Sequence, residues 1–145
     1  MMFPRLLAAA LAAFLGLCLG GPGFADDSDQ ASIQNVMHGM FDRPDAELVI
    51  DPIVVEGGFS VAGWTQGDMG GRAFHRKRGS EWSLVLCTGD EIRSAEALTA
   101  SGVPADTAAR LAADIAEVEK TVDADRLKMF ASFQGVVQME EQPSH

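Results

Sequence analysis

Apolar residues recur at a helical period soon after residue 25. Between residues 28 and 42 they fall three and four positions apart, which places them on one face of a helix. The residues of this face are Ile33, Val36, Met37, Met40 and Phe41. Pro44 disfavours helical geometry in the residue before it, so the pattern ends there. The spacing predicts one amphipathic helix over 28–42.

The pattern changes between residues 46 and 87 to short β-branched and aromatic runs separated by glycines. Tight glycine turns between such runs are typical of an antiparallel meander. We expect its four strands at 47–56, 59–66, 71–78 and 82–87. Pro52 indicates an interruption or an edge position for the first strand. In the last strand, simple alternation would place Trp82, Leu84 and Leu86 on one face and Val85 and Cys87 on the other.

The helical period returns after Gly89. Asp90 or Ser94 would cap a helix that Gly102 closes, and Pro104 suits the first turn of the next one. A last helix is predicted over 123–133, and a short strand is an option over 135–139. The predicted fold class is therefore α+β: an N-terminal helix, a four-stranded antiparallel meander, then two or three C-terminal helices.

The first 25 residues have the order of a secretory signal peptide. Arg5 is the only charged residue before Asp26, and an apolar and small-residue run over 6–20 follows it. Helix-breaking residues at 21–23 then lead to the small residue Ala25, which suits a peptidase site. This order predicts export, with cleavage directly before Asp26.

Two alternatives to cleavage are a retained membrane anchor and a lipoprotein. The apolar run over 6–20 is shorter than the ~20 residues that a membrane-spanning helix needs. A lipoprotein would need Cys18 as its lipid site, but the bulky Leu17 before it does not suit that processing. We therefore expect a periplasmic protein that is not inserted in the membrane after cleavage.

Cleavage would leave a single domain over 26–145, with a frayed tail at 140–145. A chain of about 120 residues can bury one core but not two. The net charge of −10 repels nucleic acid and anionic membranes, and it either attracts a cation or a basic partner or serves solubility alone. Cys18 would leave with the signal peptide, so Cys87 would be the sole thiol in an oxidising compartment.

The sequence after residue 25 contains no recognised catalytic motif. It has no Gly-x-Ser-x-Gly, no His-Glu-x-x-His and no Cys-x-x-Cys. Its glycine-rich stretch at 67–71 lies between predicted strands, whereas a phosphate-binding loop leads into a helix, so we interpret it as a hairpin turn. We predict a protein that is not an enzyme.

Sulfur and imidazole groups are the more specific candidates. Together they select cuprous copper, because a soft d¹⁰ ion prefers polarizable donors. Met37, His38 and Met40 place three such groups within four residues of one helix. Met69 is expected at a hairpin tip, and Cys87 is either a ligand or a buried small hydrophobe. The candidate metal ligands are Met37, His38, Met40, Met69 and Cys87, with His75, Met129 and Met139 as further donors.

Geometry complicates a site built from the helix alone. Met37 and Met40 share the apolar face, so both could simply be core residues. His38 is turned about 100° from Met37 by the helical period. A third donor would then have to come from elsewhere, such as Met69 or Met139.

A series of short motifs runs through most of the chain. They are Phe-Asp-Arg-Pro-Asp-Ala at 41–46, Pro-Ile-Val-Val at 52–55, Ala-Gly-Trp-Thr-Gln-Gly at 62–67, Gly-Gly-Arg-Ala at 70–73, Leu-Cys-Thr-Gly-Asp at 86–90 and Phe-Ala-Ser-Phe-Gln-Gly at 130–135. In this order they resemble the small exported bacterial proteins named copper uptake system-associated proteins. The resemblance implies a periplasmic role in copper supply in a Gram-negative bacterium, without catalysis. It brings no agreed set of metal ligands.

The sequence thus leads to one expectation and one alternative. We expect a periplasmic accessory of copper uptake that binds cuprous copper transiently or docks to a copper transporter or chaperone. The alternative is a metal-free interaction or inhibitor domain, whose sheet edge or acidic surface would meet a protein partner.

Overall fold

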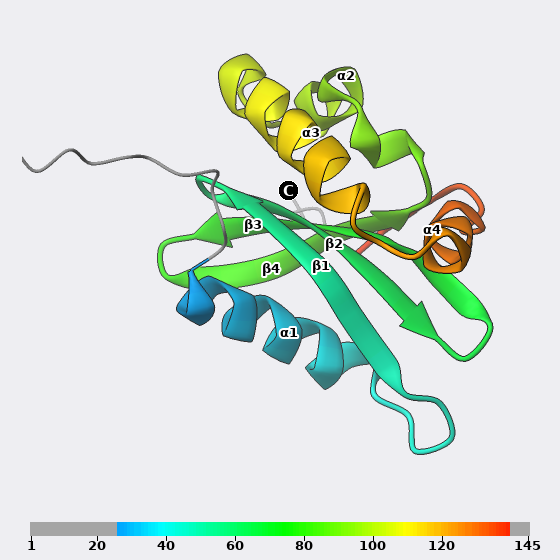
Figure 1. Ribbon diagram of the computed structural model, residues 1–145. Helices are drawn as coiled ribbons and strands as arrows, with labels where there is room; N and C mark the ends of the chain where they lie inside the picture. Colours follow the sequence, from blue (N-terminus) through cyan, green and yellow to red (C-terminus); the bar gives the residue numbers. More distant parts are fainter. Residues whose placement is uncertain (1–25, 140–145) are drawn as a thin grey trace, which may run out of the picture.

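The computed structural model describes residues 26–139 and confirms the predicted α+β class (Figure 1). One helix precedes an antiparallel sheet, and the remaining helices follow it. The elements are α1 (Asp27–Phe41), β1 (Leu48–Glu56), β2 (Phe59–Gln66), β3 (Met69–Arg78), β4 (Glu81–Thr88), the short 3₁₀ turn η1 (Glu91–Arg93), α2 (Ala95–Ala100), α3 (Ala105–Glu119), α4 (Ala124–Ala131) and β5 (Val136–Gln138). The predicted signal peptide and C-terminal tail lie outside the described residues.

The sheet has the strand order β1-β2-β3-β4-β5, and every neighbouring pair is antiparallel. Gly57, Gly67 and Gly79 turn the meander with positive φ values near 60°, which glycine adopts without steric cost. The four expected strands are all present. The optional fifth strand at 135–139 is real and pairs with β4.

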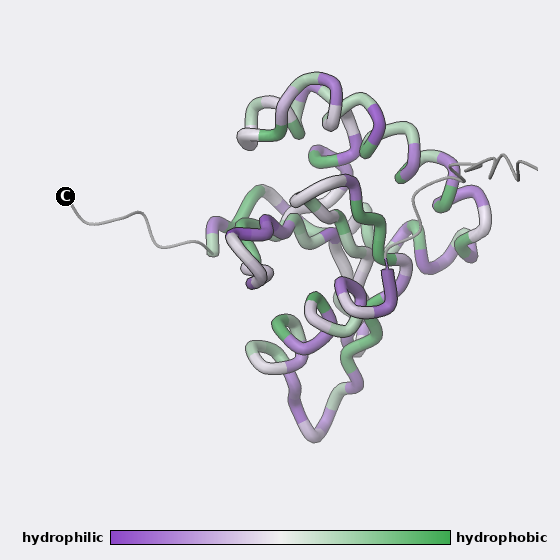
Figure 2. Tube along the Cα trace, turned by 90° about the vertical axis from the view of Figure 1, so that its left-hand side faces the viewer, coloured by the Kyte–Doolittle hydropathy of each residue, from purple (hydrophilic) through white to green (hydrophobic). Residues whose placement is uncertain are grey.

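The sheet lies between two layers of helices, which Figure 2 shows from the side. The first layer is α1, whose first turn is capped by the Asp26 side chain accepting a hydrogen bond from the Ser28 amide at 2.7 Å. This helix buries Ile33 and Met37 against one face of the sheet, which we call the α1 face.

The second layer consists of α2 and α3, which cover the opposite face, called here the α3 face. Ser94 caps α2 by accepting from the Ala97 amide, and Pro104 precedes α3, as the sequence predicts. The long α3 buries Ala108, Leu111 and Ile115 against the sheet. None of the helices within residues 26–139 has the length and apolarity needed to cross a membrane.

One expectation about β4 is wrong. Trp82 and Leu84 do share a face, but Leu86 packs with Val85 on the α3 face, and Cys87 lies on the α1 face. The reason is a β-bulge: Phe74 pairs with Leu86 and His75 pairs with Leu84, so Val85 is an extra residue in β4. A bulge interrupts alternation and redirects the side chains that follow it. It thereby turns Cys87 toward α1.

Glycines let α4 and the segment after it lie close to the sheet. A Cβ at Gly63 would come within 2.5 Å of the Phe130 ring, and one at Gly70 would lie 2.8 Å from the Met129 carbonyl oxygen. The hairpin turn predicted at 67–71 is shorter than expected, because β3 already begins at Met69. Gly70 belongs to the strand and serves the packing of α4.

Candidate functional site

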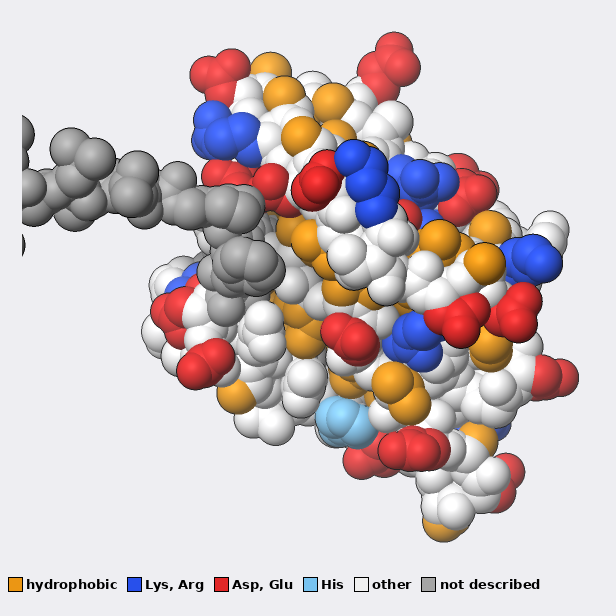
Figure 3. Space-filling view, viewed as in Figure 1, with side chains coloured by type: hydrophobic (Ala, Val, Ile, Leu, Met, Phe, Trp, Pro, Cys, Tyr) orange, Lys and Arg blue, Asp and Glu red, His pale blue; other side chains and the backbone are white. Residues whose placement is uncertain are grey.

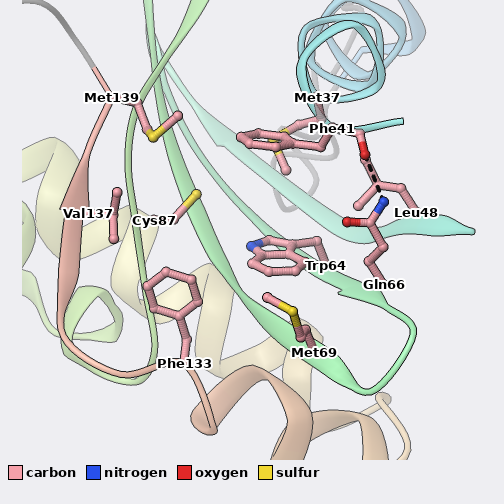
Figure 4. Close-up of a pocket in the computed structure, with 10 residues that line it drawn as sticks. All are labelled: Met37, Phe41, Leu48, Trp64, Gln66, Met69, Cys87, Phe133, Val137 and Met139. Atoms are coloured by element: carbon pink, nitrogen blue, oxygen red, sulfur yellow. Dashed lines mark hydrogen bonds between the residues drawn. The ribbon is translucent and has the colours of Figure 1, made fainter. Parts of the chain in front are cut away.

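An apolar pocket of about 230 Å³ opens on the α1 face of the sheet. It is bounded by the end of α1, by β1 to β4 and by the segment that carries β5 (Figure 4). The lining residues are Met37, Phe41, Leu48, Trp64, Gln66, Met69, Cys87, Phe133, Val137 and Met139. Almost all of this wall is hydrocarbon or sulfur, so the pocket suits a ligand without strong hydration.

Four of the lining side chains contain sulfur, and each comes from a different element. Met37 lies on α1, Met69 begins β3, Cys87 is near the end of β4, and Met139 directly follows β5. Figure 4 shows the four side chains arranged around the pocket, with Cys87 between Met139 and the Trp64 ring. The structure thus gathers soft donors from residues that are up to about a hundred positions apart in the sequence.

The four sulfur groups differ in their access to solvent. Met37 and Cys87 are 1% and 5% exposed, Met139 is partly buried, and Met69 is 52% exposed. Met69 therefore lies at the entrance, while Met37 and Cys87 form the floor. An exposed thioether at the mouth of a pocket can meet an incoming ion before the buried groups do.

Cys87 is a free thiol in the described structure. Burial raises its pKa from 9.0 to about 11, because the apolar surroundings penalise the thiolate. At neutral pH the group is therefore a neutral thiol that resists oxidation and alkylation. A metal ion would bind here only by displacing the thiol proton.

The pocket also contains two polar side chains. Gln66 uses its amide group as a donor to the backbone oxygens of Phe41 and Ala46, at 2.7 and 3.3 Å. These bonds fix the end of α1 and the loop after it to β2. Figure 4 shows the side-chain oxygen of Gln66 turned toward the pocket. The second polar group is the indole nitrogen of Trp64, which has no hydrogen-bond partner among the described residues.

The predicted helical trio does not form one site. Met37 points into the pocket, whereas Met40 is 50% exposed and is not part of the pocket wall. His38 lies at the surface, where its Nδ1 is 2.6 Å from the Asp42 carboxylate. Neighbours in an α-helix point in different directions, and here only Met37 faces the sheet.

The other predicted residues divide in the same way. Met69 and Cys87 line the pocket together with Met37, and the further donor Met139 joins them. His75 is completely buried on the α1 face but is not part of the pocket wall. Met129 lies on α4, beside Gly70.

Trp64 and Phe133 are not among the candidate site residues predicted from the sequence. Both rings line the pocket and meet edge to face, with centroids 6.0 Å apart and planes 78° apart. The signal that could have pointed to these rings is Gly71, which lies opposite Trp64 when β2 and β3 pair. A glycine opposite a large aromatic residue marks a place where a ring lies across the neighbouring strand.

Metal cages of the usual composition are not seen between residues 26 and 139, since no three His, Cys, Asp or Glu side chains gather there. That set does not include methionine, which supplies three of the four sulfur groups of the pocket. Comparison of the chain with protein families, curated proteins and solved structures finds no match. The resemblance to the copper uptake system-associated proteins therefore stays a prediction from the sequence.

Proposed function

We propose that this protein is a periplasmic accessory of copper uptake and that it holds a cuprous ion in the sulfur-lined pocket. The observation that supports the proposal is the convergence of Met37, Met69, Cys87 and Met139 on one apolar cavity. Cuprous copper prefers polarizable sulfur donors. A pocket with three thioethers and one thiol supplies these donors and little else.

Charge favours the same ligand. A monovalent cation bound by one thiolate forms a neutral unit, which an apolar pocket accommodates without an uncompensated charge. A divalent ion at Cys87 would leave one positive charge unpaired, since no carboxylate among residues 26–139 lines the pocket. The donor set therefore favours Cu⁺ over Zn²⁺ and Cu²⁺.

The position of the donors suggests how an ion enters and leaves. Met69 would accept the ion at the entrance and pass it to the buried Met37 and Cys87. Met139 would contribute from the segment after β5, which also covers one side of the pocket. A site with one exposed donor suits transient binding, so a transporter or chaperone could remove the ion at the same mouth.

The direct test is titration of the protein from Asp26 onward with cuprous ion, without oxygen, against a chromophoric chelator. We expect one ion per chain, and at least tenfold weaker binding for Cys87→Ala and for Met37→Leu, each of which loses a ligand while keeping an apolar side chain. Met40→Leu is the matched control, because it changes the same residue type three positions along the same helix. Equal affinities for all three variants would contradict the pocket as the copper site.

The metal-free alternative is supported by a different observation. β5 forms an outer edge of the sheet, and its Val136 and Val137 are exposed apolar residues. The acidic net charge gives this alternative less support, because Figure 3 shows carboxylates interspersed with cationic side chains on the visible face. If the protein binds no cuprous ion, and if Val136→Lys nevertheless impairs copper uptake by cells, the role is docking through β5.

A further inference from the structure

The described structure leaves one buried donor of the pocket without a partner. Trp64 is only 7% exposed, and its Nε1–H donates no hydrogen bond to any described residue. Burying an N–H group without an acceptor costs free energy, so native proteins rarely leave one unpaired without a functional reason. The group lies in the wall of the pocket, where a bound species could supply the acceptor.

The other tryptophan of the α1 face shows the usual arrangement. Trp82 Nε1 donates to the Asp29 carboxylate of α1 at 2.9 Å. Asp29 is also paired with Lys77 at 3.0 Å, which completes that small network. The same sheet face thus satisfies one indole and leaves the other unpaired, and only the unpaired one borders the pocket.

The Trp64 ring is held in place by its surroundings. A Cβ at Gly71 would lie 3.1 Å from Trp64 Cζ2 and 3.0 Å from Phe133 Cδ2, so this glycine lets both rings lie over β3. The edge-to-face contact with Phe133 restrains the ring further. Figure 4 shows the indole nitrogen on the side of the ring that faces Cys87. The donor therefore lies on the thiol side of the ring, and no hydrogen bond joins the two groups in the described structure.

We propose that the Trp64 indole N–H donates a hydrogen bond to the sulfur of Cys87 when a cuprous ion is bound. This inference rests on the proposed function. When copper binds, the S–H bond of Cys87 breaks, a Cu–S bond forms, the proton leaves to solvent and copper stays monovalent. A thiol sulfur is a weak acceptor, whereas a metal-bound thiolate carries negative charge and accepts more strongly.

Trp64 is in this view a positioning residue and not a ligand. It would stabilise the thiolate in a pocket to which the described part of the chain contributes no cationic side chain. Its bond would form only in the loaded state, so the free-energy cost of the unpaired N–H in the empty protein would be recovered on binding. The affinity for a cuprous ion bound to the Cys87 thiolate would therefore depend in part on Trp64, although the indole does not touch the metal.

The test is a titration of the ¹⁵N-labelled protein from Asp26 onward with cuprous ion, followed by ¹H–¹⁵N spectra of the two indole groups. Trp64→Phe and Trp82→Phe assign the resonances. We expect the Trp64 indole proton to shift downfield on binding, while the Trp82 resonance stays in place. We further expect Trp64→Phe to bind about tenfold more weakly, as loss of one hydrogen bond to a charged acceptor predicts. Trp82→Phe should keep the wild-type affinity.

The outcomes separate the two proposals. If copper binds in the pocket but the Trp64 resonance does not move, or if Trp64→Phe binds as tightly as wild type, this inference is wrong and the proposed function stands. If no cuprous ion binds to the wild-type protein, both are wrong. If Trp64→Phe does not fold, the shift of the wild-type indole resonance decides alone.

Discussion

The two faces of the sheet differ in how fully their buried polar groups are hydrogen-bonded. On the α3 face, Arg72 is almost fully buried, and each of its three guanidinium nitrogens donates a hydrogen bond. It binds the Glu119 carboxylate at 2.8 and 3.0 Å, Asp90 at 2.8 Å and the Gly89 carbonyl oxygen at 3.1 Å. On the α1 face, Ser60, Trp64 and His75 are buried, and none of their side-chain polar atoms makes a hydrogen bond of regular geometry with a described residue.

The helix on the α3 face also buries more residues than the helix on the α1 face. On the α3 face, α3 buries four residues, and one of them is Glu119, which pairs with Arg72. On the α1 face, α1 buries only Ile33 and Met37. A helix that buries fewer side chains is expected to open locally at a lower free energy. We therefore expect α3 to stabilise the fold more than α1, which borders the pocket.

The largest expected effect concerns the buried ion pair. Arg72→Met should lower the free energy of unfolding by about 3–5 kcal/mol, because it leaves the buried Glu119 without its main partner. Urea unfolding measures this directly. Arg93→Met is the control: Arg93 also contacts Glu119 but is half exposed, so its loss should cost about 1 kcal/mol or less. Equal losses for the two variants would contradict the assignment of Arg72 as the central group of the α3 face.

The next effect belongs to the α1 face and depends on pH. Burial lowers the pKa of His75 from 6.5 to about 4, because the apolar surroundings penalise the imidazolium, and the Ala73 backbone offsets this only in part. The unfolded chain therefore takes up a proton more readily than the folded one. Stability from this group is complete above pH 6.5 and decreases as the pH falls toward 4, by about 3 kcal/mol in total.

Urea unfolding at several pH values between 7 and 4 measures this loss. His75→Leu replaces the titrating group with an apolar side chain, so the difference between wild type and variant isolates His75 from the carboxyl groups. The wild-type protein should lose more stability than the variant over this range. Parallel curves for the two proteins would show that His75 is not buried as a neutral side chain.

A smaller effect tests how α4 is held on the α3 face. Gly70→Ala should lower the free energy of unfolding by about 1–3 kcal/mol, because the new Cβ would lie 2.8 Å from the Met129 carbonyl oxygen and α4 would have to move. Gly58→Ala in the turn between β1 and β2 is the control for the same substitution without a close contact, since the nearest atom to its Cβ would be 3.7 Å away. Thermal unfolding of the two variants compares them. Similar melting temperatures would contradict the close contact between α4 and β3.

The smallest effect has the opposite sign. Gly39 lies inside α1, and a Cβ there would meet no atom within 4 Å. Gly39→Ala should therefore stabilise the protein by about 0.5–1 kcal/mol, because glycine has more conformational freedom to lose in a helix. Urea unfolding should also show no change in the slope with denaturant. A destabilised variant would mean that α1 needs the glycine for a closer approach than the structure shows.

Local features of the fold could be predicted from the sequence alone. The helical period before Pro44, the β-branched runs and the turn glycines led to α1 and to four strands with boundaries within two residues of those in the structure. These features depend on backbone geometry and on which face of an element is apolar, and both are set by residues close together in the chain. The class of fold followed from their order.

The site was decided by tertiary structure. Met37, His38 and Met40 are adjacent in the sequence but point in different directions, while Met37, Met69, Cys87 and Met139 meet only because α1, the sheet and the last segment pack together. Cys87 itself faces the pocket only because of the bulge at Val85, since strict alternation would have turned it toward α3. One extra residue in a strand pair depends on how the two strands align, and periodicity along a single strand cannot show it.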